Sequence, residues 1–171
     1  GFPVVSKVVN PVDSVTLFVS DVDDFYGELA EVTKIPSSVY QAEWIVSNPC
    51  IETWLYYCYN NDPWNELEEV VGLCVLKRSQ RMKQLCGKVV TGGVDPRKAF
   101  LRIDVGIKNS REHYVEDDNG IPKLFSTQMY RMMDFIRTEM NKRHSEYDAY
   151  VRRQQEIRDK WRNSGKVKNH K

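Results

Sequence analysis

Residues Thr53–Tyr59 read TWLYYCY, so that almost every side chain in this segment is apolar or aromatic. Aromatic residues are enriched in strands, and turn residues follow directly at Asn60-Asn61-Asp62. A short apolar run that ends at a turn is typical of a buried strand. We therefore expect Thr53–Tyr59 to be the central strand of a sheet, with Trp54 in the core.

Four further segments have the composition of strands. Val-rich runs at Pro3–Val9 and Ser14–Ser20 flank a short Pro/Asn turn, and this arrangement predicts a hairpin. A second hairpin is predicted from Gly87–Val90 and Lys98–Ile107, which are separated by a loop with two glycines and a proline at residues 92–96. Prolines and serines interrupt residues 35–49, which fit neither strand nor helix clearly.

Three segments have helical patterns. Asp21 can cap a helix over about residues 22–33, in which apolar side chains recur at spacings of three and four. Asp62 followed by Pro63 is a strong helix start, an apolar stripe follows it to about Leu76, and basic residues at 77–83 lie toward the end of the predicted helix. A long helix is predicted from about Ser126, because methionines and an isoleucine form one stripe as far as residue 140.

The length of 171 residues fits one domain, which we place at residues 1–145, followed by a basic helical extension at 146–171. The chain has no apolar run long enough to cross a membrane and no secretory signal pattern. Its four cysteines lack C-x-x-C pairs, and only three histidines accompany them, so we expect neither disulfides nor a metal site. These features favour a cytoplasmic or nuclear location.

The end of the chain is basic, since residues 131–171 hold 12 Lys and Arg against 6 Asp and Glu. Such a tail can bind an acidic partner or nucleic acid, or it can be a solvated helix face. Beyond Lys142 the apolar residues thin out to a sparse stripe, which consists of Tyr147, Tyr150, Val151, Ile157 and Trp161. A helix of this kind can dock on a partner or lie across its own domain.

Three motifs in order resemble the initiation-factor-4E family of mRNA cap-binding proteins. Residues 22–26 (VDDFY) are similar to the family's VEDFW helix start, and Thr53-Trp54-Leu55 is similar to its GGxWL strand. Leu85–Val90 (LCGKVV), a loop, a second strand and then Asn109-Ser110-Arg111-Glu112 follow the order of its VCGAVV strand, basic loop, strand and NRE. The resemblance covers Val15–Glu112 and implies an α+β fold with a curved antiparallel sheet and helices packed on one face.

The resemblance also implies a binding site for capped mRNA. Family members stack the methylated base between two tryptophans and hold its phosphates with Arg and Lys. Trp44 is the candidate for one stacking residue, whereas the other tryptophan has no counterpart in this chain. Arg97, Lys98 and Arg102 are the candidate phosphate ligands. The alternatives are that Trp44 lies in the core or at its rim and that the cations are simply solvated.

A second implied site is a partner-binding surface on the convex, helical face. There the family grips a partner helix, and the matching residues of this chain are Val22, Tyr26, Leu67 and Val71. All four are apolar or aromatic, and an apolar groove would reward a complementary helix. The alternative is that the C-terminal helix of this chain covers the groove.

Two functions follow as hypotheses. The first is cap or RNA binding in translation or RNA regulation, and the second is a protein-interaction scaffold of the same fold that has lost the nucleotide. We expect no enzyme, because the chain has no nucleophile elbow, P-loop or H-E-x-x-H motif. No cofactor is expected.

Overall fold

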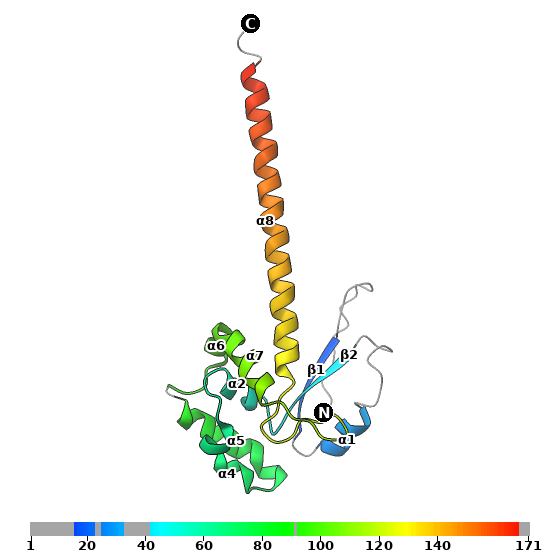
Figure 1. Cartoon of the computed structure of the whole chain (residues 1–171), viewed down its shortest axis with the longest axis vertical. Helices are drawn as coiled ribbons and strands as arrows, with labels where there is room; N and C mark the ends of the chain where they lie inside the picture. Colours follow the sequence, from blue (N-terminus) through cyan, green and yellow to red (C-terminus); the bar gives the residue numbers. More distant parts are fainter. Residues whose placement is uncertain (1–15, 23–24, 33–41, 91, 168–171) are drawn as a thin grey trace. The chain divides into compact units, whose positions relative to one another are not determined.

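The computed structural model describes residues 16–22, 25–32, 42–90 and 92–167. The chain divides into two compact units, residues 1–133 and residues 134–171. The sheet and the helices α1 to α7 belong to the first unit (Figure 1). The second unit consists of the greater part of the helix α8 (Met129–Val167).

The sheet of the first unit pairs two parallel strands, β1 (Thr16–Asp21) and β2 (Ala42–Ser47). Parallel strands cannot be joined by a tight turn, and the connection between them contains the helix α1 (Tyr26–Val32). The strand predicted at Ser14–Ser20 is confirmed for residues 16–20. Its predicted partner, Pro3–Val9, lies outside the described residues.

The predicted curved antiparallel sheet is wrong. Among the described residues, the named strands form one sheet of two parallel strands, and the remainder is mostly helical. The segment Thr53–Tyr59, predicted as the central strand, instead forms the helix α2 (Glu52–Tyr57). Trp54 therefore lies in a helix, and the sheet on which the initiation-factor-4E resemblance depends is missing from the described residues.

The helix α2 is apolar on nearly every side because it is buried on several sides. Trp54, Tyr56, Tyr57 and Cys58 are all buried. The Tyr57 hydroxyl donates to the Phe125 carbonyl oxygen at 2.8 Å, so its polar end is also satisfied. Periodicity cannot distinguish such a buried helix from a buried strand, which explains why the sequence predicted the wrong class.

The predicted strand Gly87–Val90 is also wrong, because residues 87–89 continue the helix α5 (Val75–Val89) and Val90 follows its end. The buried face of α5 consists of Ser79, Met82, Leu85 and Cys86, which recur at helical spacing. Gly87 lies on the exposed face, where a glycine weakens a helix by about 1 kcal/mol without ending it.

The predicted strand Lys98–Ile107 is wrong as well. This segment forms the end of the short helix α6 (Pro96–Ala99), the helix η2 (Phe100–Arg102) and the first half of α7 (Ile103–Glu112). The Asp95 side chain caps α6 by accepting from the Arg97 backbone N–H at 3.0 Å. Asp95-Pro96 is therefore a helix start rather than part of a hairpin loop.

The helix predicted from Pro63 to about Lys83 begins correctly but is broken twice. Asp62 accepts from the Asn65 backbone N–H, as expected of a cap, and starts α3 (Pro63–Glu66). Leu67 leaves the helical conformation before α4 (Glu68–Val71), and α5 starts only at Val75. Burial of the Leu67 side chain in the core accompanies this break.

The core of the first unit has three apolar clusters. The largest joins α2 to α5 and to Phe125, and the second joins α2 to β2 and α7. The third covers the end of the sheet with Val22, Leu29, Val46 and Ile121. Helix α8 starts at Met129, a few residues after the predicted Ser126, and the Thr127 hydroxyl accepts from the Met129 N–H at 3.1 Å.

Candidate functional site

Trp44, the predicted stacking residue, lies on β2 directly opposite Phe18 of β1. The two rings are stacked with their centroids 5.0 Å apart, and Trp44 also packs against the apolar cluster at the end of the sheet. One face of the indole is therefore already used by a neighbouring strand. This position agrees with the rim interpretation of Trp44.

Arg97, Lys98 and Arg102 come from one short helical segment, α6 and η2. The Arg97 Nε lies 3.1 Å from Asp95 Oδ1, and this neighbour lowers the pKa of the Asp95 carboxyl. The Arg102 guanidinium lies 4.9 Å from the centre of the Tyr59 ring. The three cations thus share one short helical segment, whereas the neighbours of Trp44 are Phe18 and the apolar cluster at the end of the sheet.

The four residues of the predicted partner groove differ in burial. Val22 and Leu67 are buried in separate apolar clusters and so belong to the core. Tyr26 and Val71 are exposed, and the Tyr26 hydroxyl donates to the Asp117 carboxylate. Val22 and Leu67 are therefore closed to a partner helix in this structure.

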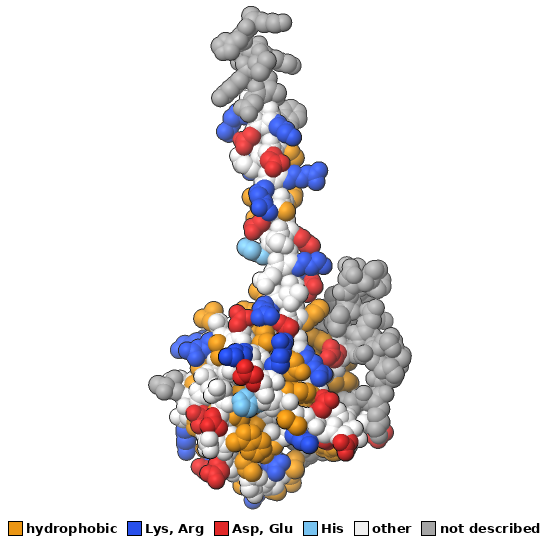
Figure 2. All heavy atoms as spheres, in the orientation of Figure 1, with side chains coloured by type: hydrophobic (Ala, Val, Ile, Leu, Met, Phe, Trp, Pro, Cys, Tyr) orange, Lys and Arg blue, Asp and Glu red, His pale blue; other side chains and the backbone are white. Residues whose placement is uncertain are grey.

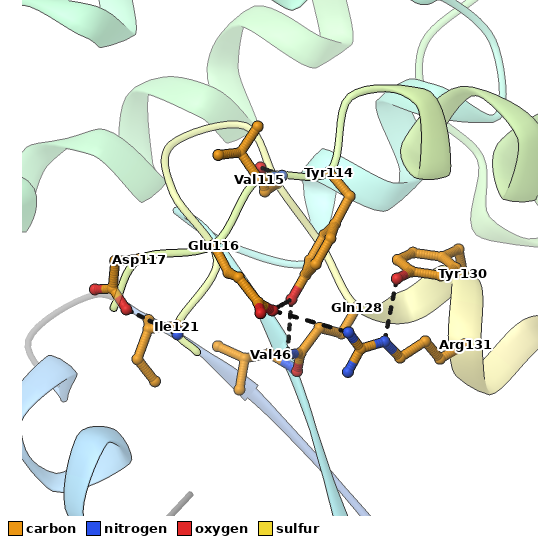
Figure 3. A network of polar contacts seen from close by, with 10 residues as sticks. Val46, Tyr114, Val115, Glu116, Asp117, Ile121, Gln128, Tyr130 and Arg131 are labelled. Atoms are coloured by element: carbon orange, nitrogen blue, oxygen red, sulfur yellow. Dashed lines mark hydrogen bonds and ion pairs between the residues drawn. The ribbon is translucent and has the colours of Figure 1, made fainter. Parts of the chain in front are cut away.

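Figure 3 shows a cluster of tyrosines and an arginine beside β2, which the sequence did not predict. The Gln128 side chain accepts from the Val46 N–H at 3.0 Å and donates to the Tyr114 hydroxyl at 3.0 Å. The Arg131 guanidinium lies 5.3 Å from the Tyr114 ring centre and 5.7 Å from that of Tyr130. The cluster joins β2 to the first turn of α8.

The chemistry of this cluster favours a structural role. Burial raises the pKa of Tyr114 to about 12, so its hydroxyl stays protonated at neutral pH and can donate to Glu116 at 2.8 Å. Arg131 is an always-charged donor, and Gln128 does not titrate. No prediction from the sequence covered this cluster, whose members Val46, Tyr114 and Gln128 are far apart along the chain.

The buried cysteines are poor nucleophiles. Cys50, Cys58 and Cys86 are buried, whereas Cys74 is exposed. Burial raises the pKa of Cys58 and of Cys86 to about 12, and that of Cys50 rises further. Because the thiolate is the reactive form, these three thiols are unreactive at neutral pH.

Metal and membrane sites were sought in the part of the chain that the structure describes. No group of three or more His, Cys, Asp or Glu side chains there is arranged to hold a metal ion. None of the described helices is long and apolar enough to cross a membrane.

The second unit presents large apolar side chains to solvent. Tyr147 is 64 % exposed and Tyr150 is 60 % exposed, and Met140 and Ile157 are 52 % and 41 % exposed. All four lie on α8, and their spacings are seven, three and seven residues. Positions 143 and 154 lie on the same face of the helix. With them included, the positions 140, 143, 147, 150, 154 and 157 follow one another at alternating spacings of three and four residues.

The pattern is that of a coiled-coil heptad, in which positions a and d form the contact seam. With Met140 at a, the a positions are Met140, Tyr147 and Gln154, and the d positions are Arg143, Tyr150 and Ile157. Four of these six residues are apolar or aromatic. The sequence prediction had named most of this stripe without recognising its period.

Figure 2 shows charges of both signs along the visible side of α8, and the sequence places polar residues on the outer faces of this part of the helix. Between Met140 and Ile157 the outer positions b, c and f hold polar or small residues, which are Asn141, Lys142, Ser145, Asp148, Ala149, Arg152, Gln155 and Glu156. Pairs within the helix also use outer positions, since Asp148 Oδ2 at position b lies 3.6 Å from His144 Nε2 at position e. The apolar stripe is therefore confined to one face.

Comparison of the chain with protein-family models, curated proteins and solved structures gave no match. The function must therefore be argued from the geometry of the chain itself. Cap binding, which the resemblance implied, stays a prediction without the curved sheet that suggested it.

Proposed function

We propose that this protein is a self-associating scaffold in which α8 of one copy forms a coiled coil with α8 of a second copy. The observation that carries the proposal is the exposed stripe of Met140, Tyr147, Tyr150 and Ile157 at heptad spacing. Association of this kind would hold two copies of the first unit on one shared helical pair.

The physical reason is the free energy of the exposed stripe. Burying apolar surface contributes roughly 25 cal/mol per Å2, and a tyrosine offers a large apolar ring with a hydroxyl that can stay at the wet edge of the seam. A helix in water gains most of its stability from packing an amphipathic face rather than from its intrinsic propensity. A second helix supplies that packing for residues 140–157.

The proposal keeps one of the two functions that the sequence suggested, the interaction scaffold, and changes its surface. The predicted groove contained Val22 and Leu67, which are buried, whereas the stripe on α8 is exposed. Cap or RNA binding has no comparable support, because Trp44 already stacks on Phe18.

The test is sedimentation equilibrium of the full chain and of a variant with Tyr147→Glu and Tyr150→Glu. These changes place four carboxylates in the seam of a pair of helices, where like charges repel and desolvation is costly. We expect the dissociation constant of the dimer to rise at least tenfold.

The matched control carries Ser145→Glu and Arg152→Glu, both at outer f positions of the same helix. It should dimerise with a dissociation constant within about threefold of the unmodified chain. Equal dissociation constants for the seam variant and the unmodified chain would show that the stripe is not the contact surface.

A further inference from the structure

Two polar residues interrupt the stripe and restrict the way in which two copies can pair. Arg143 occupies a d position and Gln154 an a position. In a parallel pair each seam position meets the same position of the other helix, so Arg143 would face Arg143. Two guanidinium groups in contact at a partly desolvated seam repel each other without a compensating partner.

An antiparallel pair removes this conflict, because each a position then faces a d position of the other helix. In the register that places Met140 opposite Ile157 of the second copy, Tyr147 faces Tyr150. The same register places Arg143 opposite Gln154. Arg143 can then donate to the side-chain oxygen of Gln154, so the two polar residues satisfy each other and the apolar residues meet apolar residues.

The charges that flank the seam agree with this orientation. Positions g hold Glu139, Glu146, Arg153 and Lys160. In the same antiparallel register Glu146 faces Arg153 of the second copy, and Glu139 faces Lys160. In a parallel pair position g instead faces position e of the next heptad, which would place Arg153 against Arg158.

Neighbouring antiparallel registers are less favourable. A shift of one heptad in one direction places Gln154 opposite Tyr150 and Arg153 opposite Arg153. A shift in the other direction places Tyr147 opposite Arg143 and Glu146 opposite Glu146. Of these three registers, only the one with Met140 opposite Ile157, the central register, pairs the two polar residues of the seam with each other. It also places opposite charges at the flanking g positions.

One flanking pair is unfavourable in the central register, because Arg137 at position e faces Arg158 of the second copy. Arg137 already pairs with Asp134 on the same helix, so its charge is partly compensated. Like charges that stay exposed to water repel weakly, and this repulsion costs less than a mismatched seam.

We infer that two copies of this chain pair through residues 139–160 of α8 in the antiparallel orientation, with Met140 opposite Ile157. The inference rests on the proposed function, because it specifies how the self-association occurs. It assigns the partner as a second copy and gives the register of the contact.

The test uses two single variants of the full chain, Met140→Cys and Ile157→Cys, both in a Cys74→Ser background that removes the exposed native thiol. Each variant is oxidised alone and in an equal mixture, and disulfide-linked dimers are measured on a non-reducing gel. A disulfide requires Cα atoms about 4.4–6.8 Å apart. In the inferred register two Met140 positions are 17 residues apart along the seam, or about 25 Å.

We expect the mixture to give linked dimers and each variant alone to give few. Linkage of each variant with itself, with no increase in linked dimers in the mixture, would show a parallel pair and overturn the orientation while leaving self-association intact. Absence of linkage from samples that sediment as dimers would overturn the register. Samples that sediment as monomers under reducing conditions would overturn the proposed function itself.

Discussion

Gly106 of α7 lies against the indole of Trp54 in α2, so closely that a Cβ atom on Gly106 would be 2.7 Å from Trp54 Cη2. The same Cβ would be 2.7 Å from Cys58 Sγ. These are distances that real Cβ atoms essentially never show, and the neighbours are buried side chains that cannot move freely. The absence of a side chain at residue 106 therefore allows α2 and α7 to pack together.

Replacement of Gly106 by alanine should destabilise the first unit. Overpacking a filled core costs about 1–3 kcal/mol, which exceeds the gain in helix propensity from alanine. Urea unfolding at fixed protein concentration measures the change. The control is Gly87→Ala on the exposed face of α5, where nothing lies within 4 Å and alanine should be neutral or stabilise by up to about 1 kcal/mol. Equal effects at the two sites would contradict the close contact.

The helix starts show how far the sequence could predict this fold. Asp62-Pro63 predicted a helix correctly, and the same pair at Asp95-Pro96 starts α6. We interpreted the second pair as part of a hairpin loop because the segment at residues 92–96 carries two glycines and a proline between two predicted strands. The local signal was correct, and a wrong neighbouring assignment overrode it.

The class of Thr53–Tyr59 could not be determined from the sequence. Its side chains are apolar all round because α2 lies among α5, α7 and β2, and burial of this kind removes the period that separates a helix from a strand. The candidate site was partly visible, since the sparse stripe on the C-terminal helix was named. The surface that packs against this stripe could not be predicted, because an apolar stripe alone does not show whether it packs within the chain or against another chain.

Gln128→Leu should destabilise the first unit by about 1–3 kcal/mol. The substitution leaves the buried Val46 N–H without its acceptor and removes a donor to the Tyr114 hydroxyl. Urea unfolding tests this, with Gln80→Leu on the exposed face of α5 as the control. A change at Gln128 no larger than that of the control would show that the polar cluster contributes little to stability.

The free energy of unfolding should decrease above pH 9 because of the buried thiols. Burial raises the pKa of Cys58 from 9.0 to about 12, so the folded state keeps a proton that the unfolded state loses. This contribution is fully present below pH 9 and is lost between pH 9 and about 12. Each such thiol adds a slope of up to about 1.4 kcal/mol per pH unit.

Urea unfolding of Cys58→Ala between about pH 8 and 11 measures that slope. We expect a shallower decrease than in the unmodified chain, whereas Cys74→Ala, which removes an exposed thiol, should leave the slope unchanged. If the free energy of unfolding fell with pH equally in Cys58→Ala and in the unmodified chain, the result would contradict the raised pKa of Cys58.

Arg153→Glu should weaken self-association about tenfold, which corresponds to about 1.4 kcal/mol. In the antiparallel register the introduced carboxylate faces Glu146 of the other copy, twice in each dimer. In a parallel pair the same carboxylate would face Arg158 and strengthen association. Arg152→Glu changes the net charge equally at an outer position and serves as the control. A tighter dimer for Arg153→Glu would contradict the antiparallel orientation.

Self-association of the unmodified chain is the claim on which the proposed function depends. Sedimentation equilibrium over a range of protein concentrations measures it directly, because the mass of one copy is 20.0 kDa. We expect the average mass to rise with concentration to twice that value and to remain there. A mass of one copy at every concentration, up to the highest that stays in solution, would contradict the account.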